Sequence, residues 1–349
     1  MGISISGGQL SNLLTKKNTA FLDEKNALLV KGLSYSDYIQ VDDTGARHRG
    51  KNGFCTQIGN QSFTFFKGST NKSKHNFLSI LQGSNTGYRL NQTAYDYLKR
   101  LKSFSNWDLF SVEYHSQAEV FFTSENEWLT YLHCQPYSKG SYKILTEAAM
   151  IGYLSQDIFR ENLMILSDEA KQFDINNNAA CWVHAERKLT KLTPEGSEQT
   201  RFKERKLNQF WRLYKSLKAE MKKGEISHQR KYQFRVRFDN LCKALPNFKK
   251  LNAELAHIHS MKLTLLRGLE NRVIPLHNNL SESDIREFVK RRKISGCTKS
   301  EDGQEAVTTY LSLKKTCQRH NISFMDYLDD RLQHLNKLPY LTEYITNPP

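Results

Sequence analysis

The first third of the chain alternates between strand-like and helical hydrophobic patterns. Residues 1–36 are Ser-rich and weakly helical around positions 8–18, which predicts the remnant of an N-terminal region. Three strand-like runs follow, separated by Gly and Asn turn residues: YIQV, FCTQIG and SFTFFKG. They predict an antiparallel meander that begins at Tyr38. Apolar residues at helical spacing then predict helices near residues 75–81, 91–101, 125–133 and 143–154.

Two continuous apolar runs in the middle of the chain predict buried strands. The run NLMIL, residues 162–166, stops at Ser167 and Asp168. The run AACWV, residues 179–183, leads into a helix that we expect to begin near His184. Together with the meander, these runs predict an α/β fold.

The pattern after Pro194 is helical throughout. Apolar residues recur every three or four positions, opposite a face of Lys and Arg; they are Leu207, Phe210, Trp211, Tyr214, Leu217 and Met221. Further helices are predicted over residues 228–245, 251–269, 303–320 and 324–335. Ser281 with Asp284 predicts an N-cap pair that opens another helix. The order of elements therefore predicts a large helical insertion in the α/β fold, followed by C-terminal helices.

The basic residues are concentrated in this helical region. The 349-residue chain has a net charge of +15, and residues 187–250 hold 19 Lys and Arg against 6 Asp and Glu. Thirteen of the excess positive charges therefore lie in one segment. This concentration predicts a polyanionic partner, nucleic acid before a membrane surface. The alternative, that the charge only keeps the protein soluble, would not require it to be concentrated in one segment.

Cysteine usage and the length of apolar runs bear on the cellular compartment. Six Cys residues are scattered without regular spacing and follow no secretory signal, which predicts a reducing cytoplasm and no disulfides. The longest apolar runs, near residues 148–154 and 263–269, are much shorter than the roughly 20 residues that span a bilayer. We therefore expect no membrane association.

Three acidic residues occupy positions where strand ends and helix starts can converge. Asp42 is expected to end the first strand, Asp168 to end a buried strand, and Glu282 to lie in the first turn of a helix. If they converge, an all-oxygen ligand set suits Mg²⁺ or Mn²⁺, and two such ions stabilise the attacking and leaving oxygens of a phosphodiester. Structural alternatives exist, with Asp42 and Asp43 as turn formers before Gly45. Likewise, Asp168 would cap the next segment and Glu282 would be a favourable charge at a helix start.

Three groups of motifs resemble, in this order, the blocks of the insertion-sequence-66 family of DDE transposases. They are VDDTGARHRGKNG, then ILSDEAKQF followed by CWVHAERKL, then PLHNNLSESDIREFVKRRKISG followed by SLKKTCQRHNISFMDYL. The resemblance extends from about residue 30 to residue 330. It implies a ribonuclease-H-like core with a mixed sheet. It also implies that Asp42, Asp168 and Glu282 form the catalytic triad and bind two Mg²⁺ or Mn²⁺ ions.

The resemblance implies a reaction and partners as well. A metal-activated water would hydrolyse a phosphodiester at the transposon end, and the freed 3′-hydroxyl would attack target DNA by transesterification. The implied partners are transposon-end and target DNA, further copies of the chain in an oligomer on DNA, and accessory proteins of a bacterial mobile element. Two alternatives are an inactive or repurposed relic that only binds DNA, and a non-mobile nuclease on the same fold.

The same resemblance implies two groups of DNA-binding residues. His184 and Arg187 belong to the family's Cys-Trp-x-His-x-x-Arg block. The predicted helix that carries Glu282 continues with five basic residues, Arg286, Lys290, Arg291, Arg292 and Lys293, and its first N–H groups would point toward phosphate. The alternatives are that Trp182 and a capped His184 belong to the core, and that the basic helix face is only solvated. Cys181 with His184 could also form half of a zinc site, although no second pair accompanies them.

The implied division of the chain follows these motifs. Residues 1–36 would be a remnant, 37–185 the first part of the core, 186–272 the basic helical insertion, 273–300 the second part of the core with the catalytic Glu helix, and 301–349 the C-terminal helices. The sequence also departs from the family pattern. Family members carry a longer N-terminal region, so we expect an N-terminal truncation. Ser283 stands where the family commonly has Arg, and residues 303–312 lack the expected basic residues.

Overall fold

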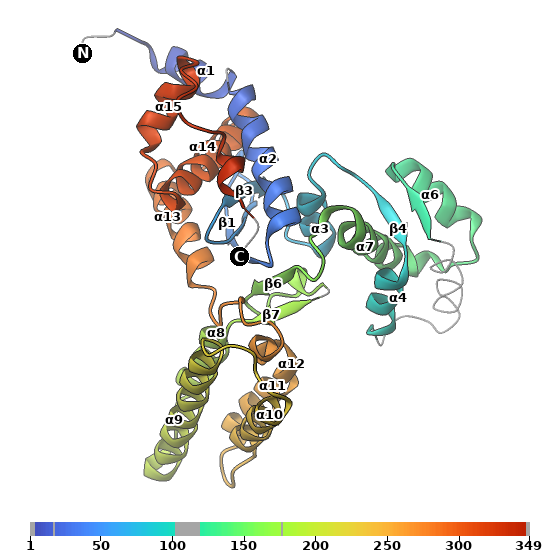
Figure 1. Cartoon of the computed structure of the whole chain (residues 1–349), viewed down its shortest axis with the longest axis vertical. Helices are drawn as coiled ribbons and strands as arrows, with labels where there is room; N and C mark the ends of the chain where they lie inside the picture. Colours follow the sequence, from blue (N-terminus) through green and yellow to red (C-terminus); the bar gives the residue numbers. More distant parts are fainter. Residues whose placement is uncertain (1–3, 17, 102–118, 176, 347–349) are drawn as a thin grey trace. The chain divides into compact units, whose positions relative to one another are not determined.

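A computed structural model describes residues 4–16, 18–101, 119–175 and 177–346 (Figure 1). The chain divides into two compact units, which are considered separately. Unit 1 comprises Met1–Leu163, Lys171–Asn176 and Leu280–Pro349, and unit 2 comprises Met164–Ala170 and Asn177–Asn279. Each unit contains both helices and strands, so the predicted α/β class is confirmed. Among the described residues, no helix combines the length and the apolar composition needed to cross a bilayer.

Unit 1 contains the predicted antiparallel meander. Its strands are β1 (Tyr38–Gly45), β2 (Phe54–Gly59) and β3 (Thr64–Ser69). Strand β1 pairs with β2 at Asp42 and Gln57, and the pairing continues to Gly45 and Phe54. The prediction that Asp42 ends the first strand is therefore wrong, because this pairing keeps the backbone extended for three more residues. The alternative of a turn at Asp42 and Asp43 is wrong for the same reason.

Most helices of unit 1 lie where the sequence pattern predicts them. The described helices of unit 1 are α1 (Gly7–Lys16), α2 (Thr19–Tyr35), α3 (Lys74–Gln82), α4 (Gln92–Lys99), α6 (Glu125–Cys134), α7 (Tyr142–Tyr153), α13 (Asn279–Ser295), α14 (Glu301–Arg319) and α15 (Phe324–Leu332). A short antiparallel pair is formed by β4 (Tyr88–Leu90) and β5 (Val120–Phe122). Shorter helical turns lie at Lys139–Ser141, Leu154–Ile158, Lys171–Phe173 and Leu341–Tyr344.

Helix α2 is packed into unit 1, although the sequence pattern does not predict it. Its apolar face is buried, with Phe21, Leu28, Leu29 and Leu33 each at most 6% exposed. Glu24 and Lys25 interrupt the apolar pattern and are buried with it. Both have partners, since Lys25 Nζ lies 2.6 Å from Glu305 Oε1 and the Tyr327 hydroxyl donates to Glu24 at 2.8 Å. Because these paired charges interrupt the apolar repeat, the hydrophobic pattern of the sequence does not predict this helix.

Helix α14 covers the edge of β3 with a row of hydroxyl side chains. Thr308, Ser312 and Thr316 recur every four residues and are at most 1% exposed. The Phe66 N–H donates to Ser312 Oγ at 2.8 Å, and the Thr64 N–H donates to Thr316 Oγ1 at 3.1 Å. These bonds satisfy edge groups that would otherwise be open to another strand. The low basic content of this segment therefore suits its packing, because a charge there would be buried.

Helix α13 begins earlier than the predicted N-cap. It starts at Asn279, so Ser281 and Asp284 lie inside its first turns and the predicted N-cap pair is wrong. Both side chains are buried, and the Ser281 hydroxyl donates to Gln57 Oε1 of β2. Farther along the helix, Phe288 stacks against a Phe of β3. The two polar residues thus find their partners in the sheet rather than at the helix start.

Asp284 fixes α13 to both the sheet and α14. Its fully buried carboxylate lies 3.2 Å from Lys315 Nζ and 2.5 Å from Arg319 Nη2. The Thr64 hydroxyl and the Gln57 amide donate to Asp284 Oδ2 at 3.0 and 3.3 Å. A buried carboxylate is stable only with such partners. This network therefore determines where α13 lies in unit 1.

Unit 2 begins with a parallel strand pair, β6 (Met164–Ser167) and β7 (Asn178–Ala180). The predicted AACWV strand is only partly right, because β7 ends at Ala180. Helix α8 (Trp182–Thr190) begins at Trp182, before the start predicted near His184. The Trp182 indole is fully buried and donates its Nε1–H to the Leu265 carbonyl at 2.7 Å. That contact places Trp182 in a helical core and ends the strand before it.

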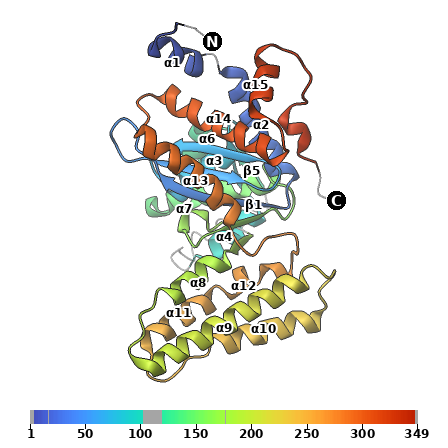
Figure 2. The ribbon, with the colours of Figure 1, turned by 90° about the vertical axis from the view of Figure 1, so that its left-hand side faces the viewer.

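The remainder of unit 2 is helical, as predicted. Its longer helices are α9 (Gly196–Glu220), α10 (His228–Cys242) and α11 (Lys249–Ser260), followed by α12 (Lys262–Leu265) and a turn at Arg267–Leu269. The single helix predicted over residues 251–269 is therefore interrupted after Ser260. Helices α9 and α10 lie side by side (Figure 2).

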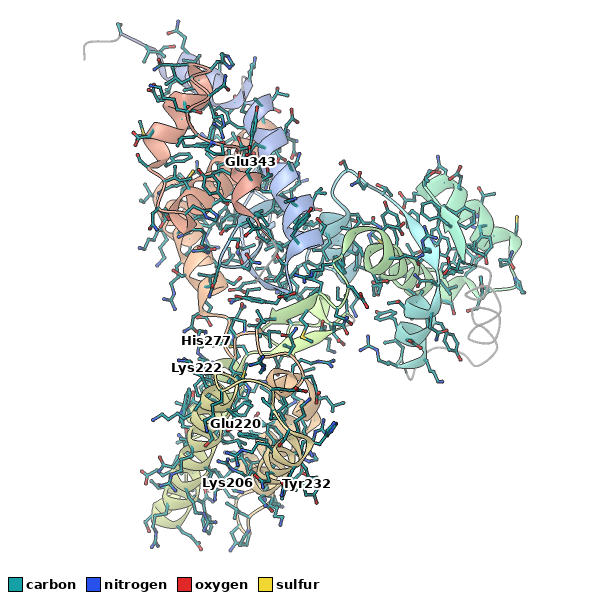
Figure 3. All side chains as sticks on the ribbon, in the orientation of Figure 1. Lys206, Glu220, Lys222, Tyr232, His277 and Glu343 are labelled. Atoms are coloured by element: carbon teal, nitrogen blue, oxygen red, sulfur yellow. The ribbon has the colours of Figure 1, made fainter. Side chains whose placement is uncertain are left out.

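A buried cation joins α9 to α10. Lys206, labelled in Figure 3, is 3% exposed and donates to the carbonyls of Leu241 and Lys243 at 2.6 and 2.9 Å. These carbonyls lie at the end of α10, where no further turn of helix supplies donors. Burial lowers the pKa of Lys206. The neighbouring core is aromatic, with the rings of Trp182 and Phe210 5.0 Å apart.

Lys25 makes the stability of unit 1 depend on pH in the alkaline range. Burial lowers the pKa of Lys25 from 10.5 to about 8, although Glu305 favours the charged form. Between these values the unfolded chain binds more protons than the folded protein, so the free energy of unfolding rises with pH. From pH 8 to 10 we expect this free energy to rise by roughly 1–3 kcal/mol more in the wild type than in Lys25→Met. Urea unfolding at each pH measures the difference, and a flat or falling difference would contradict the assignment.

The Asp284 network predicts a large, localised loss of stability. Asp284→Ala leaves Lys315 and Arg319 without their buried counter-charge, and we expect the free energy of unfolding to fall by about 3–5 kcal/mol. Glu287→Ala is the matched control on α13, because Glu287 pairs with Lys314 at 3.0 Å but is 35% exposed. We expect a loss below about 1 kcal/mol for the control. Similar losses in urea unfolding of both variants would show that the network does not hold α13.

Candidate functional site

Asp42 projects from the face of the meander that α13 covers. Side chains of directly paired residues in antiparallel strands lie on the same face, and Asp42 is paired with Gln57. Gln57 in turn contacts Ser281 and Asp284 of α13. The Asp42 side chain is half-buried, and its Oδ1 accepts the Asp43 N–H at 2.8 Å. Asp42 is therefore held in a rigid strand opposite the helix that carries Glu282.

Asp43 lies on the other face of the same strand. Its carboxylate is 11% exposed, and Oδ2 accepts a hydrogen bond from Gln172 Nε2 at 2.5 Å. Lys72 Nζ lies 3.9 Å from Oδ1. Asp43 therefore takes part in contacts within unit 1.

Glu282 lies in the first turn of α13, directly after Ser281. Its side chain is 13% exposed, and Arg286 Nη2 lies 3.4 Å from Oε2. Ser281 binds Gln57, which is the cross-strand partner of Asp42. Unit 1 thus brings the start of α13 to the part of the sheet that carries Asp42.

Asp168 lies in unit 2, directly after β6, as the sequence predicts. The side chain is half-buried, and its Oδ1 accepts the Ala170 N–H at 3.0 Å. This hydrogen bond is the local capping contact that the structural alternative predicts. It occupies one carboxylate oxygen only, so the contact is compatible with a second role for the side chain.

The residue after Asp168 belongs to an ionic cluster of unit 2. Glu169 Oε2 lies 2.6 Å from His257 Nε2 and also accepts a hydrogen bond from Lys188. Burial opposes ionisation of Glu169, but hydrogen bonds from Lys188 and His257 outweigh burial and lower the pKa of its carboxyl. The cluster ties α8 and α11 to the segment that follows β6.

The three predicted metal ligands differ in the unit to which they belong. Asp42 and Glu282 lie in unit 1, and Asp168 lies in unit 2. Their carboxylate oxygens are the donors that Mg²⁺ and Mn²⁺ prefer. Within the part of the chain that the structure describes, no three His, Cys, Asp or Glu side chains form a group that could hold a metal ion. The donor chemistry of the triad fits the metal, while its assembly stays a prediction.

The first predicted DNA-binding pair lies on α8. Arg187 Nη1 and His184 Nε2 are 3.1 Å apart, and both side chains are half-buried. Trp182 packs in the core of unit 2, which confirms that part of the structural alternative. Cys181 is buried and its Sγ accepts the Asn278 N–H at 3.3 Å. The contacts of Trp182 and Cys181 are those of core residues, and the DNA-binding role of the pair stays a prediction.

The second predicted DNA-binding group lies on α13. Its exposed members are Arg286, Lys290, Arg291 and Lys293. Arg292 is half-buried and its guanidinium donates to the Gly45 carbonyl and, at 3.4 Å, to Thr44 Oγ1. Together with Arg47 it lines a cavity of about 680 Å³ beside the end of β1. Arg292 therefore has a structural contact that the sequence pattern does not indicate.

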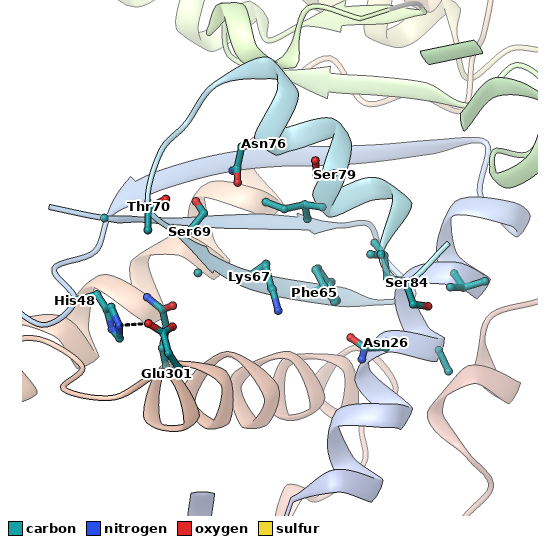
Figure 4. Close-up of a pocket in the computed structure, with 18 of the residues that line it drawn as sticks. Asn26, His48, Phe65, Lys67, Ser69, Thr70, Asn76, Ser79, Ser84 and Glu301 are labelled. Carbon is teal, nitrogen blue, oxygen red and sulfur yellow. Dashed lines mark hydrogen bonds and ion pairs between the residues drawn. The ribbon is translucent and has the colours of Figure 1, made fainter. Parts of the chain in front are cut away.

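A cavity of about 1280 Å³ lies in the described part of unit 1 (Figure 4). It is bounded by α2, β3, α3 and the start of α14. Lys67 and Asn76 lie on its walls, and His48 Nε2 lies 3.1 Å from Glu301 Oε1 at one end. Its described lining includes neither Asp42 nor Glu282. This cavity is therefore not the predicted catalytic site.

Two residues that position the site were missed by the sequence analysis. Gln57 links the partner strand of Asp42 to α13, and Asp284 fixes that helix. The available signal for Gln57 was a polar residue inside the apolar run FCTQIG. Asp284 had a misleading signal, because an acid three residues after Ser281 is also the pattern of a helix start.

Comparison with known proteins assigns the family. The sequence matches the family described as "Transposase IS66 family" over residues 125–306, a span that includes Asp168 and Glu282 and begins after Asp42. It is also 38% identical over 308 residues to "Uncharacterized protein y4jO" of Sinorhizobium fredii (strain NBRC 101917 / NGR234). That alignment covers 87% of this chain and 94% of the relative. The family match alone extends over half of the chain, and the chain therefore belongs to the IS66 family of transposases.

Proposed function

We propose that this protein cleaves and joins DNA strands at the ends of a mobile element, as a DDE transposase with Asp42, Asp168 and Glu282 as its catalytic carboxylates. The observation that carries the proposal is in unit 1. Asp42 shares a sheet face with Gln57, and Gln57 binds the residue next to Glu282. Two half-buried carboxylates on rigid elements, belonging to a chain of a transposase family, suit a site for metal-dependent strand cleavage.

We infer a ribonuclease-H-like core from the order of the elements. Three antiparallel strands come first, a parallel strand pair carries Asp168 at its end, and the helix with Glu282 follows. Between the last two stand the helices of residues 186–272, which we assign as a basic insertion in that core. The remaining parts of the proposed division are residues 37–185 and 273–300 for the core and 301–349 for the C-terminal helices.

The carboxylates of Asp42, Asp168 and Glu282 would hold two Mg²⁺ or Mn²⁺ ions. When bound, such ions supply charge stabilisation for the attacking and leaving oxygens of phosphodiester exchange. The protein holds the carboxylates in position. Strand pairing fixes Asp42, and the contacts of Ser281 and Asp284 fix the helix that carries Glu282. The DNA partners are transposon ends and target DNA, held by His184, Arg187 and the basic residues of α13.

The proposal predicts that Glu282 is needed for cleavage and not for folding or DNA binding. We expect Glu282→Gln to lower the rate of 3′-end cleavage by at least about 100-fold, because a metal ligand is lost. Glu287→Gln on the same helix is the matched control, since this partly exposed residue pairs with Lys314. We expect the control to keep its activity within about threefold. The assay is cleavage of duplex DNA carrying the sequences that flank the gene, with Mg²⁺ or Mn²⁺ and with a chelator.

Two results would count against this function. Cleavage by Glu282→Gln at the wild-type rate would remove Glu282 from the triad. Salt-sensitive DNA binding by the wild type without metal-dependent cleavage of any flanking sequence would favour a relic that only binds DNA. Cleavage that ignores the flanking sequences and joins no ends would instead favour a non-mobile nuclease.

A further inference from the structure

The outer face of α9 carries a continuous row of cations. Arg201, Arg205, Arg212 and Lys215 are exposed and recur at intervals of four, seven and three residues, which keeps them on one side of the helix. We call these four residues the α9 stripe. The opposite side of α9 carries Phe210, Leu213 and Leu217, which are at most 2% exposed in the core of unit 2. The stripe therefore faces solvent along its whole length.

The cations of the stripe are not neutralised by acids. Across the described ranges of the chain, none of the four forms an ion pair with Asp or Glu. The guanidinium of Arg205 lies 5.3 Å from the Phe202 ring and is thus held against the helix surface. Two exposed acids, Glu198 and Glu204, flank the row without pairing with it. The stripe therefore keeps a net positive charge.

The neighbouring helix α10 also has three Arg and one Lys side chains, but these make contacts with acidic or hydroxyl side chains of unit 2. Arg230 lies 3.2 Å from Glu220, which is labelled in Figure 3. Lys231 and Arg235 lie 2.9 and 2.8 Å from the two carboxylate oxygens of Glu270. Arg237 donates to the Ser216 hydroxyl at 3.2 Å. Three of the four α10 cations are therefore in ion pairs with acids of unit 2, whereas none of the α9 stripe is within the described part of the chain.

The dimensions of the stripe suit the backbone of duplex DNA. Fourteen residues separate Arg201 from Lys215, which is about 21 Å along a helix. Duplex DNA carries one phosphate charge for about every 1.7 Å of its axis, so several phosphates lie within that length. No exposed aromatic residue stands between the cations of the stripe, and the exposed uncharged polar residues there are Asn208 and Gln209. Such a surface recognises charge and not base sequence.

We propose that the α9 stripe binds the phosphate backbone of duplex DNA without sequence preference, and that α10 does not. The inference rests on the proposed function, since DNA is the substrate there. It assigns the non-specific binding of DNA to one face of one helix, and this face is separate from the proposed DNA-binding residues on α8 and α13. A face of this kind would hold the duplex while other residues select and cleave the element's ends.

The test compares two variants of the full chain with the same change in charge. In the α9 variant, Arg201, Arg205, Arg212 and Lys215 are replaced by Gln; in the α10 variant, Arg230, Lys231, Arg235 and Arg237 are replaced by Gln. Each variant loses three Arg and one Lys. Fluorescence anisotropy with a labelled 30-base-pair duplex of arbitrary sequence gives the dissociation constant at NaCl concentrations from about 50 to 300 mM.

We expect the α9 variant to flatten the slope of log affinity against log salt by about three to four, because each lost phosphate contact changes it by about 0.9. The α10 variant should change that slope by less than about one. The double variant of Arg212→Gln with Lys215→Gln should give about half the α9 effect, and it serves if the fourfold variant does not fold. Equal changes in the α9 and α10 variants, or none in α9, would overturn the proposal.

The outcomes also separate this inference from the proposed function. Suppose that the wild type binds DNA but never cleaves it, and that the α9 variant flattens the dependence of binding on salt. This result would support the stripe and refute the transposase chemistry. Wild-type cleavage with an unchanged slope in the α9 variant would refute the stripe alone. Polyglutamate and unlabelled duplex, added at equal charge, can each compete with the labelled duplex. If polyglutamate displaces the labelled duplex as effectively as unlabelled duplex does, the partner is an acidic protein and the proposal is overturned.

Discussion

The buried carboxylate of Asp284 constrains the architecture of unit 1. A charge in a protein interior costs several kcal/mol of desolvation, so it must be matched by partners in defined positions. Lys315 and Arg319 provide these partners from α14, and Gln57 and Thr64 provide them from the sheet. Two helices and the meander therefore meet at one point. The position of Glu282, two residues before Asp284 on α13, follows from a network whose members take no part in the proposed chemistry.

The same electrostatic rule distinguishes cations that are paired within the fold from cations that can bind a partner. Cations that face acids inside a unit are committed to the fold, as are Lys25 beside Glu305 and Lys231 beside Glu270. Cations that form no ion pair within the described part of the chain keep their charge for a partner, as do those on the outer side of α9. Total charge predicts that the protein binds a polyanion. The pattern of pairing indicates which helix is suited to bind it.

Local patterns predicted the elements whose buried face is mainly apolar, including those that also bury single polar residues such as Gln57 and Lys206. The meander and helices α6, α7, α9 and α10 are of this kind, because one window of sequence contains the whole signal. Prediction failed at α2 and at Ser281 with Asp284, where polar side chains are buried. Their partners are distant in the chain, with 280 positions between Lys25 and Glu305 and 227 between Gln57 and Asp284. No local window can contain such a pair.

The sequence by itself, through its residue types and short-range spacing, determined the α/β class, the concentration of positive charge and the three candidate carboxylates, and its motifs carried the resemblance to the family. The remaining features of the site were established only by contacts between segments that are distant in the sequence. They place Asp42 within a strand on the face that α13 covers, commit Asp43 to Gln172 and Lys72, and give Arg292 a structural role. The reason is physical: a hydrophobic period is encoded in neighbouring residues, whereas the pairing of a buried charge depends on which segments the fold brings together.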